Sequence, residues 1–411
     1  PTFGHSSQAC LAGRNTFMLN GSANLKNLGG LMKELPDGFC DRLAERDLDA
    51  VEDLLQAAFP GSAPASDVDA DKTARLLIRF VATCCESGCV EQAERVVAVI
   101  DAARRRHPAY VKAYARAAFN LLTIYGEIGE VDRAAAYYQD IIKNAEKYNV
   151  AVVLREVFRS GYGLTTYMAR QGRLTEAIDT LDALIDRLWA TKEHQDYAGA
   201  VAKAAYNVMT ASGHIEGADT ADLIYARLRV LARKFPANVE TAETLARGTH
   251  NIVVFLGSQG RIADAEDRYA EITELAQVWS DQTSISSSFG QCTVNIVAVL
   301  LNNNQTDRAL EIATHYADRY RNACIEEMRY AAKCLFNLIP YLVASERSYD
   351  LDTVYNRLLQ VRDDSSDDTD VVRQVGRAEA NLSVLAAALG QFDWALELIY
   401  RIAARANQTA D

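Results

Sequence analysis

A recurring step from Asn to Ala constrains what this chain can fold into. Ala265 follows Asn251 by fourteen residues, and the same step occurs at four other places. A sixth copy pairs Asn337 with Leu351, and two more copies keep the Ala without the Asn. The remaining pairs are Asn120/Ala134, Asn207/Ala221, Asn295/Ala309, Asn381/Ala395, Arg79/Ala93 and Gly163/Ala177.

The Ala column gives the length of the repeated unit. It lies at positions 93, 134, 177, 221, 265, 309, 351 and 395, so it advances in steps of 41 to 44 residues. The chain therefore holds eight copies of a unit of about 43 residues. A period of this size is typical of a stacked repeat array, in which each repeat contacts only its neighbours.

Each repeat is predicted to be a helix, a short turn and a second helix. Three residues before the Asn column, most copies resemble Gly248 in having a small residue, which predicts a close approach of that helix to a neighbour. Four residues after the Ala column comes an apolar, often aromatic residue such as Tyr269. A Gly that can adopt a positive φ angle suits the turn. Five copies have one, namely Gly88, Gly129, Gly172, Gly260 and Gly390.

The composition fits a folded helical protein. Of the 411 residues, 49% are apolar and only seven are Pro. We therefore expect an all-α fold, with one continuous solenoid of eight helix-turn-helix repeats over residues 71–411. Residues 1–70 fit no repeat. They predict an irregular N-terminal segment and a helix, from Pro36 to about Phe59, that caps the apolar end of the array.

Charge and cysteine content narrow the class of function. The net charge of −12 disfavours a general binder of nucleic acid or of anionic membranes. No apolar run approaches the roughly 20 residues that a membrane helix needs. The eight Cys form no disulfide framework, so a reducing cytoplasm is the expectation, with an export signal removed before Pro1 left open. We expect no enzyme activity, no cofactor and no metal, since no phosphate loop, zinc spacing or catalytic constellation is present.

The repeated pattern resembles a known family. The Asn, a Gly nine residues later, an Ala five residues after that and then an aromatic residue are similar to the tetratricopeptide repeat, over roughly residues 71–405. The units are longer than the usual 34 residues, and the early Trp of the family is missing. The resemblance implies a right-handed superhelix whose first helices line a concave groove, and a role in protein-protein interaction.

A second column lies four residues before the Asn column and is cationic in seven of eight copies. Residues four apart share one face of a helix, so cations and amides form a ladder. An Asn amide can both donate to and accept from a peptide backbone, and a cation can bind carboxylates. Lys-x-x-x-Asn pairs of tetratricopeptide domains that hold acidic tails are similar. The predicted ligand is an extended, acidic peptide or partner segment, and the predicted site residues are Arg116, Asn120, Arg159, Lys203, Asn207, Arg247, Asn251, Asn295, Lys333, Asn337, Arg377 and Asn381.

A third column changes character along the chain. Three residues after the Asn column, polar side chains give way to apolar ones, which predicts a groove whose two halves differ. The residues are Thr123, Thr166, Thr210, Val254, Ala298, Pro340 and Val384.

Three other interpretations stay open at this point. The Asn side chains could bridge neighbouring helices and leave the cations merely solvated. The groove could bind single-stranded RNA or another polyanion, because aromatic residues such as Tyr206 and Phe336 directly precede the Asn column. The protein could also be an adaptor or regulatory subunit that uses its ends and its convex face inside a larger assembly.

Overall fold

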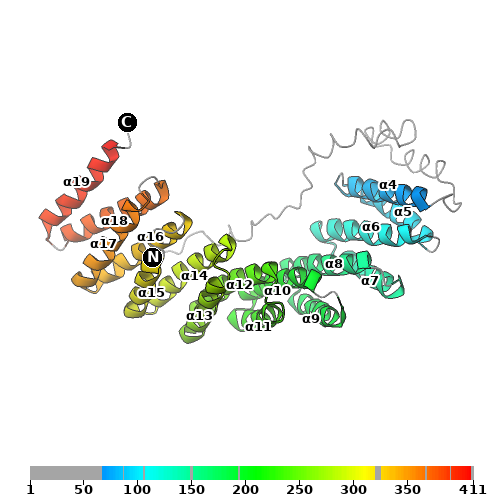
Figure 1. Ribbon diagram of the computed structural model, residues 1–411, viewed down its shortest axis with the longest axis horizontal. Coiled ribbons are helices and arrows are strands. Elements are labelled where there is room, and N and C mark those ends of the chain that lie inside the picture. Colours follow the sequence, from blue (N-terminus) through cyan, green and yellow to red (C-terminus); the bar gives the residue numbers. More distant parts are fainter. Residues whose placement is uncertain are drawn as a thin grey trace. The chain divides into compact units, whose positions relative to one another are not determined.

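The computed structural model describes residues 67–86, 88–104, 107–148, 151–192, 195–319, 325–365, 368–388 and 390–408 (Figure 1). The predicted irregular segment and capping helix of residues 1–66 lie outside them. Over the described ranges all regular structure is helical, in sixteen helices without a strand. The predicted all-α class is confirmed.

The helices alternate as the repeat predicts. The second helices are α5 (Val90–Ala103), α7 (Val131–Tyr148), α9 (Leu174–Ala190), α11 (Ala218–Lys234), α13 (Ile262–Val278), α15 (Thr306–Arg319), α17 (Ser348–Asp363) and α19 (Phe392–Gln408). The first helices are α4 (Asp67–Glu86), α6 (Pro108–Glu127), α8 (Ala151–Arg170), α10 (Gln195–Ile215), α12 (Val239–Ser258), α14 (Thr283–Asn302), α16 (Ile325–Ala344) and α18 (Thr369–Ala388). Eight helix pairs match the eight predicted repeats, although α4 begins at Asp67 rather than at residue 71.

The chain divides into two compact units, which the sequence did not predict. The N-terminal unit comprises residues 1–124 and 146–153, and the C-terminal unit comprises residues 125–145 and 154–411. The division passes through α6, α7 and α8. In the N-terminal unit α4 packs on α5, and the Arg104 guanidinium at the end of α5 lies 4.3 Å from the centre of the Tyr114 ring of α6.

The C-terminal unit is a two-layered solenoid. From α10 to α16, each first helix contacts the first helix of the next repeat, and from α10 to α18 each contacts its own second helix. Each second helix from α9 to α17 also contacts the first helix that follows it. First helices therefore lie side by side in one layer and second helices in the other (Figure 1). The right-handed sense stays a prediction from the resemblance.

Small residues permit these contacts where the sequence predicts a close approach. A Cβ atom added to Gly248 would lie 2.8 Å from Cδ2 of Leu228, on the preceding second helix. The first helices approach each other in the same way, since a Cβ atom on Gly213 would lie 2.2 Å from the Phe255 ring. A larger side chain at either position would require the neighbouring side chain or helix to move.

The turns reverse the chain as predicted. All five predicted glycines have positive φ angles, between 73° and 88°. In the sixth and seventh repeats the same position holds Asn304 and Glu346, whose φ angles are 59° and 57°. A left-handed Glu is unfavourable because its Cβ atom crowds the backbone, so this turn is strained relative to the glycine turns.

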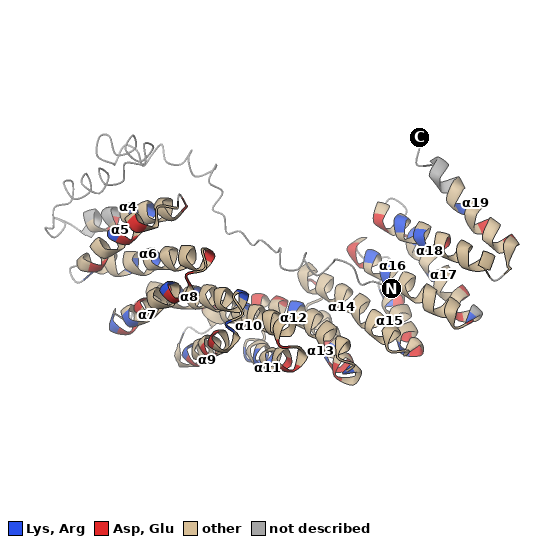
Figure 2. Cartoon of the chain, turned by 180° about the vertical axis from the view of Figure 1, so that it is seen from behind, with Lys and Arg blue, Asp and Glu red and all other residues tan. Residues whose placement is uncertain are grey.

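Helix α14 has an unusual composition. It carries no Lys, Arg, Asp or Glu and is uniformly tan in Figure 2. By length and composition it is long and apolar enough to cross a membrane, which the sequence analysis did not expect. It contacts α12, α13, α15 and α16, as the other first helices contact their neighbours, and half of its most apolar stretch is buried.

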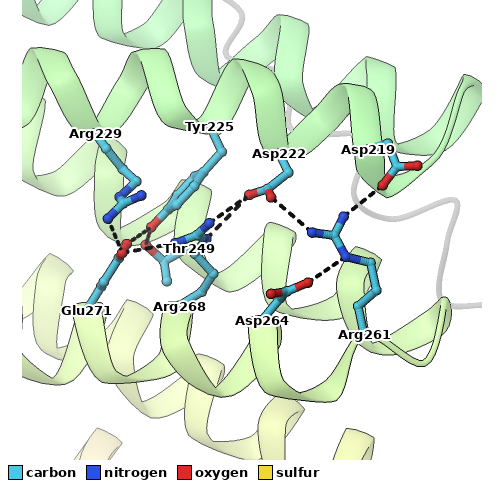
Figure 3. A network of polar contacts seen from close by, with 9 residues as sticks. All are labelled: Asp219, Asp222, Tyr225, Arg229, Thr249, Arg261, Asp264, Arg268 and Glu271. Carbon is cyan, nitrogen blue, oxygen red and sulfur yellow. Dashed lines mark hydrogen bonds and ion pairs between the residues drawn. The ribbon is translucent and has the colours of Figure 1, made fainter.

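Ion pairs join second helices at their turns. The Arg that directly precedes the second helix in three repeats reaches an Asp in the first turn of the preceding second helix. The Arg261 guanidinium also binds Asp222 and Asp264, so that several pairs merge into the network of Figure 3. We call these three links the turn clasps. They are Arg173 to Asp132 (2.7 Å), Arg261 to Asp219 (2.8 Å) and Arg347 to Asp307 (2.5 Å).

Candidate functional site

In the C-terminal unit, the predicted ladder lies on one face of the first-helix layer. One side of each first helix carries the Asn together with the residue four positions before it and the residue three positions after it. Hydrogen bonds between successive first helices at these positions, such as Asn207 to Thr166, place the columns side by side. We call this surface of the C-terminal unit the first-helix face. In the N-terminal unit, Arg116 is exposed and Asn120 is half-buried.

The first two amides of this face bridge neighbouring helices. Nδ2 of Asn207 donates to Oγ1 of Thr166 at 2.9 Å, and Thr166 in turn donates to the carbonyl of Tyr162. Nδ2 of Asn251 lies 3.1 Å from Oγ1 of Thr210 and 3.3 Å from the Tyr206 hydroxyl. The helix-bridging interpretation therefore holds for these two residues. We call the part of the face on α8, α10 and α12 the paired half.

The next three amides meet different neighbours. The position of the Thr partner is taken by an apolar residue in each preceding first helix, namely Val254, Ala298 and Pro340. None of these side chains can accept a hydrogen bond. Within the described residues, the side chains of the three Asn make no hydrogen bond, and water reaches all three. They are Asn295 and Asn337, which are half-buried, and Asn381, which is exposed.

We call the part of the face on α14, α16 and α18 the open half. An apolar row runs beside its amides along the third column, and it begins with Val254 at the end of α12. Val254 is 40% exposed and Val384 is 69% exposed, while Pro340 is also exposed. Unpaired amides next to exposed apolar side chains offer both hydrogen bonds and apolar contact to a ligand.

The cation column is partly neutralised. Lys203 forms an ion pair with Glu240 of the next first helix. The carboxylate can lie there because Gly199 has no side chain: an added Cβ atom would be 1.6 Å from Oε2 of Glu240. Arg159 lies 3.9 Å from Glu156, a buried acid on its own helix. These two cations are therefore less available to a ligand than the sequence suggests.

Three other cations of the column have no carboxylate partner among the described residues. The Arg247 guanidinium lies 5.5 Å from the centre of the Tyr206 ring, and Nζ of Lys333 lies 5.3 Å from that of Tyr330. Arg377 is exposed. In the open half, Lys333 and Arg377 lie one helical turn before the unpaired amides of their own helices.

An acidic column lies near the start of the first helices, two helical turns before the cations, and the sequence analysis missed it. Eleven residues before the Asn column lie Asp196, Glu240, Glu326 and Asp370, with Ser284 in the uncharged α14. The Ser287 hydroxyl of α14 donates a hydrogen bond to Glu326 of α16 at 2.8 Å. The column was visible in the sequence at the spacing of i and i+7 from the cations. It makes the first-helix face mixed in charge rather than purely cationic.

The aromatic column beside the Asn residues is half-buried. Tyr162, Tyr206, His250 and Phe336 are all partly covered by neighbouring helices. Burial lowers the pKa of His250 to about 4, so the ring is neutral at pH 7. Packing of the rings between helices leaves less aromatic surface for stacking on nucleic-acid bases.

Other reactive groups are confined by burial. In the described ranges, no group of three or more His, Cys, Asp and Glu side chains could hold a metal ion. Cys84 and Cys85 are buried free thiols, and burial raises the pKa of Cys84 to about 12. A thiol with that pKa is not a nucleophile near pH 7.

Comparisons with known proteins give no family for this chain. No family model matches the chain, and no curated protein matches it. Among solved structures, an engineered protein is 14% identical with a TM-score of 0.48, covering 86% of this chain and 85% of its own. The apo form of RapI is 13% identical with a TM-score of 0.40, over 81% of this chain and 87% of its own. The apo quorum sensor NprR from B. thuringiensis is 11% identical with a TM-score of 0.36, over 92% and 98%. These values do not identify a function, and the fold rests on the helices described above.

Proposed function

We propose that the protein is a non-enzymatic interaction protein that binds an extended peptide or partner segment on the open half of the first-helix face. The observation that carries the proposal is the set of three amides, Asn295, Asn337 and Asn381, without an intramolecular hydrogen bond. A partly buried amide in this state gains more from a ligand hydrogen bond than one already bonded to a Thr.

The geometry of stacked helices suits an extended ligand. Neighbouring helices pack about 8–10 Å apart, and an extended chain advances about 3.3 Å per residue. The distance from one first helix to the next therefore corresponds to about three ligand residues. The ligand backbone would bond to the amides, and apolar ligand side chains would cover the row that includes Val254 and Val384. Acidic ligand groups would bind Lys333 and Arg377.

The proposal extends to family and location. We infer a tetratricopeptide-like protein with repeats of about 43 residues that works in the cytoplasm without a cofactor. Single-stranded RNA is the weaker candidate, because the same first helices also carry Glu326 and Asp370, whose carboxylates would repel a phosphate backbone.

A comparison of two variants tests this proposal. A phage-displayed random peptide library would be selected on the full chain, and the affinity of a selected peptide measured by calorimetry. We expect Asn295→Ala/Asn337→Ala/Asn381→Ala to lower the affinity by about 100-fold, since three hydrogen bonds of about 1 kcal/mol each are lost. The matched control, Asn207→Ala/Asn251→Ala, should keep the affinity. Equal binding by the triple variant would refute the proposal.

A further inference from the structure

The outer face of α19 exposes large apolar side chains. Leu396 and Ile399 are each 49% exposed, and Tyr400 is 71% exposed. Together with Asp393, Glu397 and Arg401, Leu396 and Tyr400 line a shallow depression on this helix. Isolated exposed apolar residues are common, but a contiguous set with a charged rim marks an interaction surface.

Two of these helix positions are covered in α11. Leu396 and Ile399 lie one and four residues after the Ala column, as Asp222 and Tyr225 do in α11. In α11 these residues bind the next repeat: Asp222 pairs with Arg268 of α13, and the Tyr225 hydroxyl is 2.8 Å from Oγ1 of Thr249 of α12. The face of α19 is thus a stacking face without a repeat on it among the described residues.

The charge pattern points the same way. Asp393 lies two residues before the Ala column, at the position of Asp132, Asp219 and Asp307, the three acceptors of the turn clasps. Each of those carboxylates receives an Arg from the following repeat. In the described part of the chain, Asp393 has no such partner. The occupant of this face should therefore supply a guanidinium as well as apolar side chains.

A second copy of α19 supplies both. Arg401 stands at the other end of the depression, where it binds Glu397 and reaches the Tyr355 hydroxyl at 3.4 Å. We propose that two copies of this chain associate through α19, with the helices antiparallel around a twofold axis near Leu398. This arrangement sets Leu396 of each copy opposite Tyr400 of the other. It also sets each Arg401 opposite the interval between Asp393 and Glu397 of the other copy.

Twofold symmetry requires a self-complementary surface, and this charge order provides one only when the helices are antiparallel. A parallel pair would place like charges together. One helix face is smaller than the standard interface of about 1,600 Å², so the expected dimer is reversible, with a dissociation constant on the order of micromolar.

Sedimentation equilibrium of the full chain, from about 1 to 100 µM, measures this association. The wild type should move from monomer to dimer. Leu396→Glu should raise the dissociation constant at least about tenfold, whereas Leu223→Glu, on an exposed site of α11, should leave it unchanged. Circular dichroism verifies that each variant is folded. A wild type that stays monomeric at 100 µM overturns the proposal, and so does a dimer that tolerates Leu396→Glu.

A mixing experiment tests the antiparallel arrangement. Arg401→Glu, and separately Asp393→Lys/Glu397→Lys, should each abolish self-association by placing like charges opposite one another. An equimolar mixture should form a heterodimer, because each substituted site then meets the opposite charge. A folding defect could not be rescued in this way. Two variants that stay monomeric when mixed would overturn the antiparallel pairing.

Discussion

Asn251 and Asn295 occupy the same position in successive repeats, yet their side chains meet different neighbours. Asn251 donates to Thr210 on the preceding first helix, whereas Asn295 has Val254 at the equivalent place. The same residue therefore stabilises the stack in the paired half and remains available for a ligand in the open half. The comparison teaches that the residue three positions after the Asn of the preceding repeat decides the role of each rung.

Low pH should have the largest effect on stability, and the residue responsible lies in the paired half. His250 belongs to α12, while α14 has Val294 at that position and α16 has Phe336. The folded-state pKa of His250, about 4, lies below the usual 6.5, so only the unfolded chain binds the proton between these values. Stability should fall as the pH drops from about 6.5 towards 4.

Because water still reaches part of the ring, we expect a loss of about 2 kcal/mol rather than the full effect of the shift. Urea unfolding at pH 7 and pH 4.5 measures it. His250→Phe, which copies the residue in α16, should remove this part of the pH dependence. The same slope in wild type and variant would contradict the assignment to His250.

Amide removal compares the two halves directly. Asn251→Ala leaves the Thr210 and Tyr206 hydroxyls without their donor, so the free energy of unfolding should fall by about 1–2 kcal/mol. Asn295→Ala removes no intramolecular hydrogen bond and should cost less than about 0.5 kcal/mol. Urea unfolding of both variants at pH 7 gives the difference. Equal losses would show that the halves do not differ as described.

The turns offer a second contrast. Asn304 and Glu346 hold left-handed turns in repeats of the open half, where Gly260 serves in the fifth repeat. Glu346→Gly should raise the free energy of unfolding by about 1 kcal/mol. Gly260→Ala should lower it by a similar amount, although no atom crowds the new Cβ. Thermal unfolding followed by circular dichroism would reveal both, and a destabilising Glu346→Gly would refute the strain argument.

A single substitution should give one Asn of the open half the hydrogen bond that is found in the paired half. Val254→Thr gives the Asn295 amide a hydroxyl partner, which should stabilise the fold by about 0.5–1 kcal/mol. With the Asn295 amide bonded to this hydroxyl, the protein should bind a selected peptide about fivefold more weakly, since one hydrogen bond of about 1 kcal/mol is lost. Val230→Thr, on an exposed site of α11, is the control and should change neither quantity. Stabilisation without a loss of affinity would remove Asn295 from the binding site.

Much of the fold was predictable because it follows from local periodicity. The Ala column, the small residue at Gly248 and the turn at Gly260 each reflect contacts that recur in every repeat. The division of the ladder was only foreshadowed by the change from Thr to apolar residues in the third column. Its meaning depends on which atoms of two repeats meet, about 41 residues apart, as Asn207 and Thr166 do.

Other features depended on long-range pairing and were missed. The ion pair of Lys203 with Glu240 needs both the acidic column and the empty space at Gly199. No periodicity of a single repeat reveals such a combination. The division into two compact units was likewise absent from the sequence analysis, because the repeat pattern continues through α6 and α8 without a break.

The turn clasps give the chain a second, longer period. They join the second repeat to the third, the fourth to the fifth and the sixth to the seventh. The other four junctions carry Glu130, Gly217, Gln305 and Gln391 where the clasping Arg would stand. In this respect the building block is a doublet of repeats. Shortening or lengthening the chain by whole doublets would keep every Arg with its Asp. Adding or removing one repeat would leave a mismatched junction, so an engineered series should be built in twos.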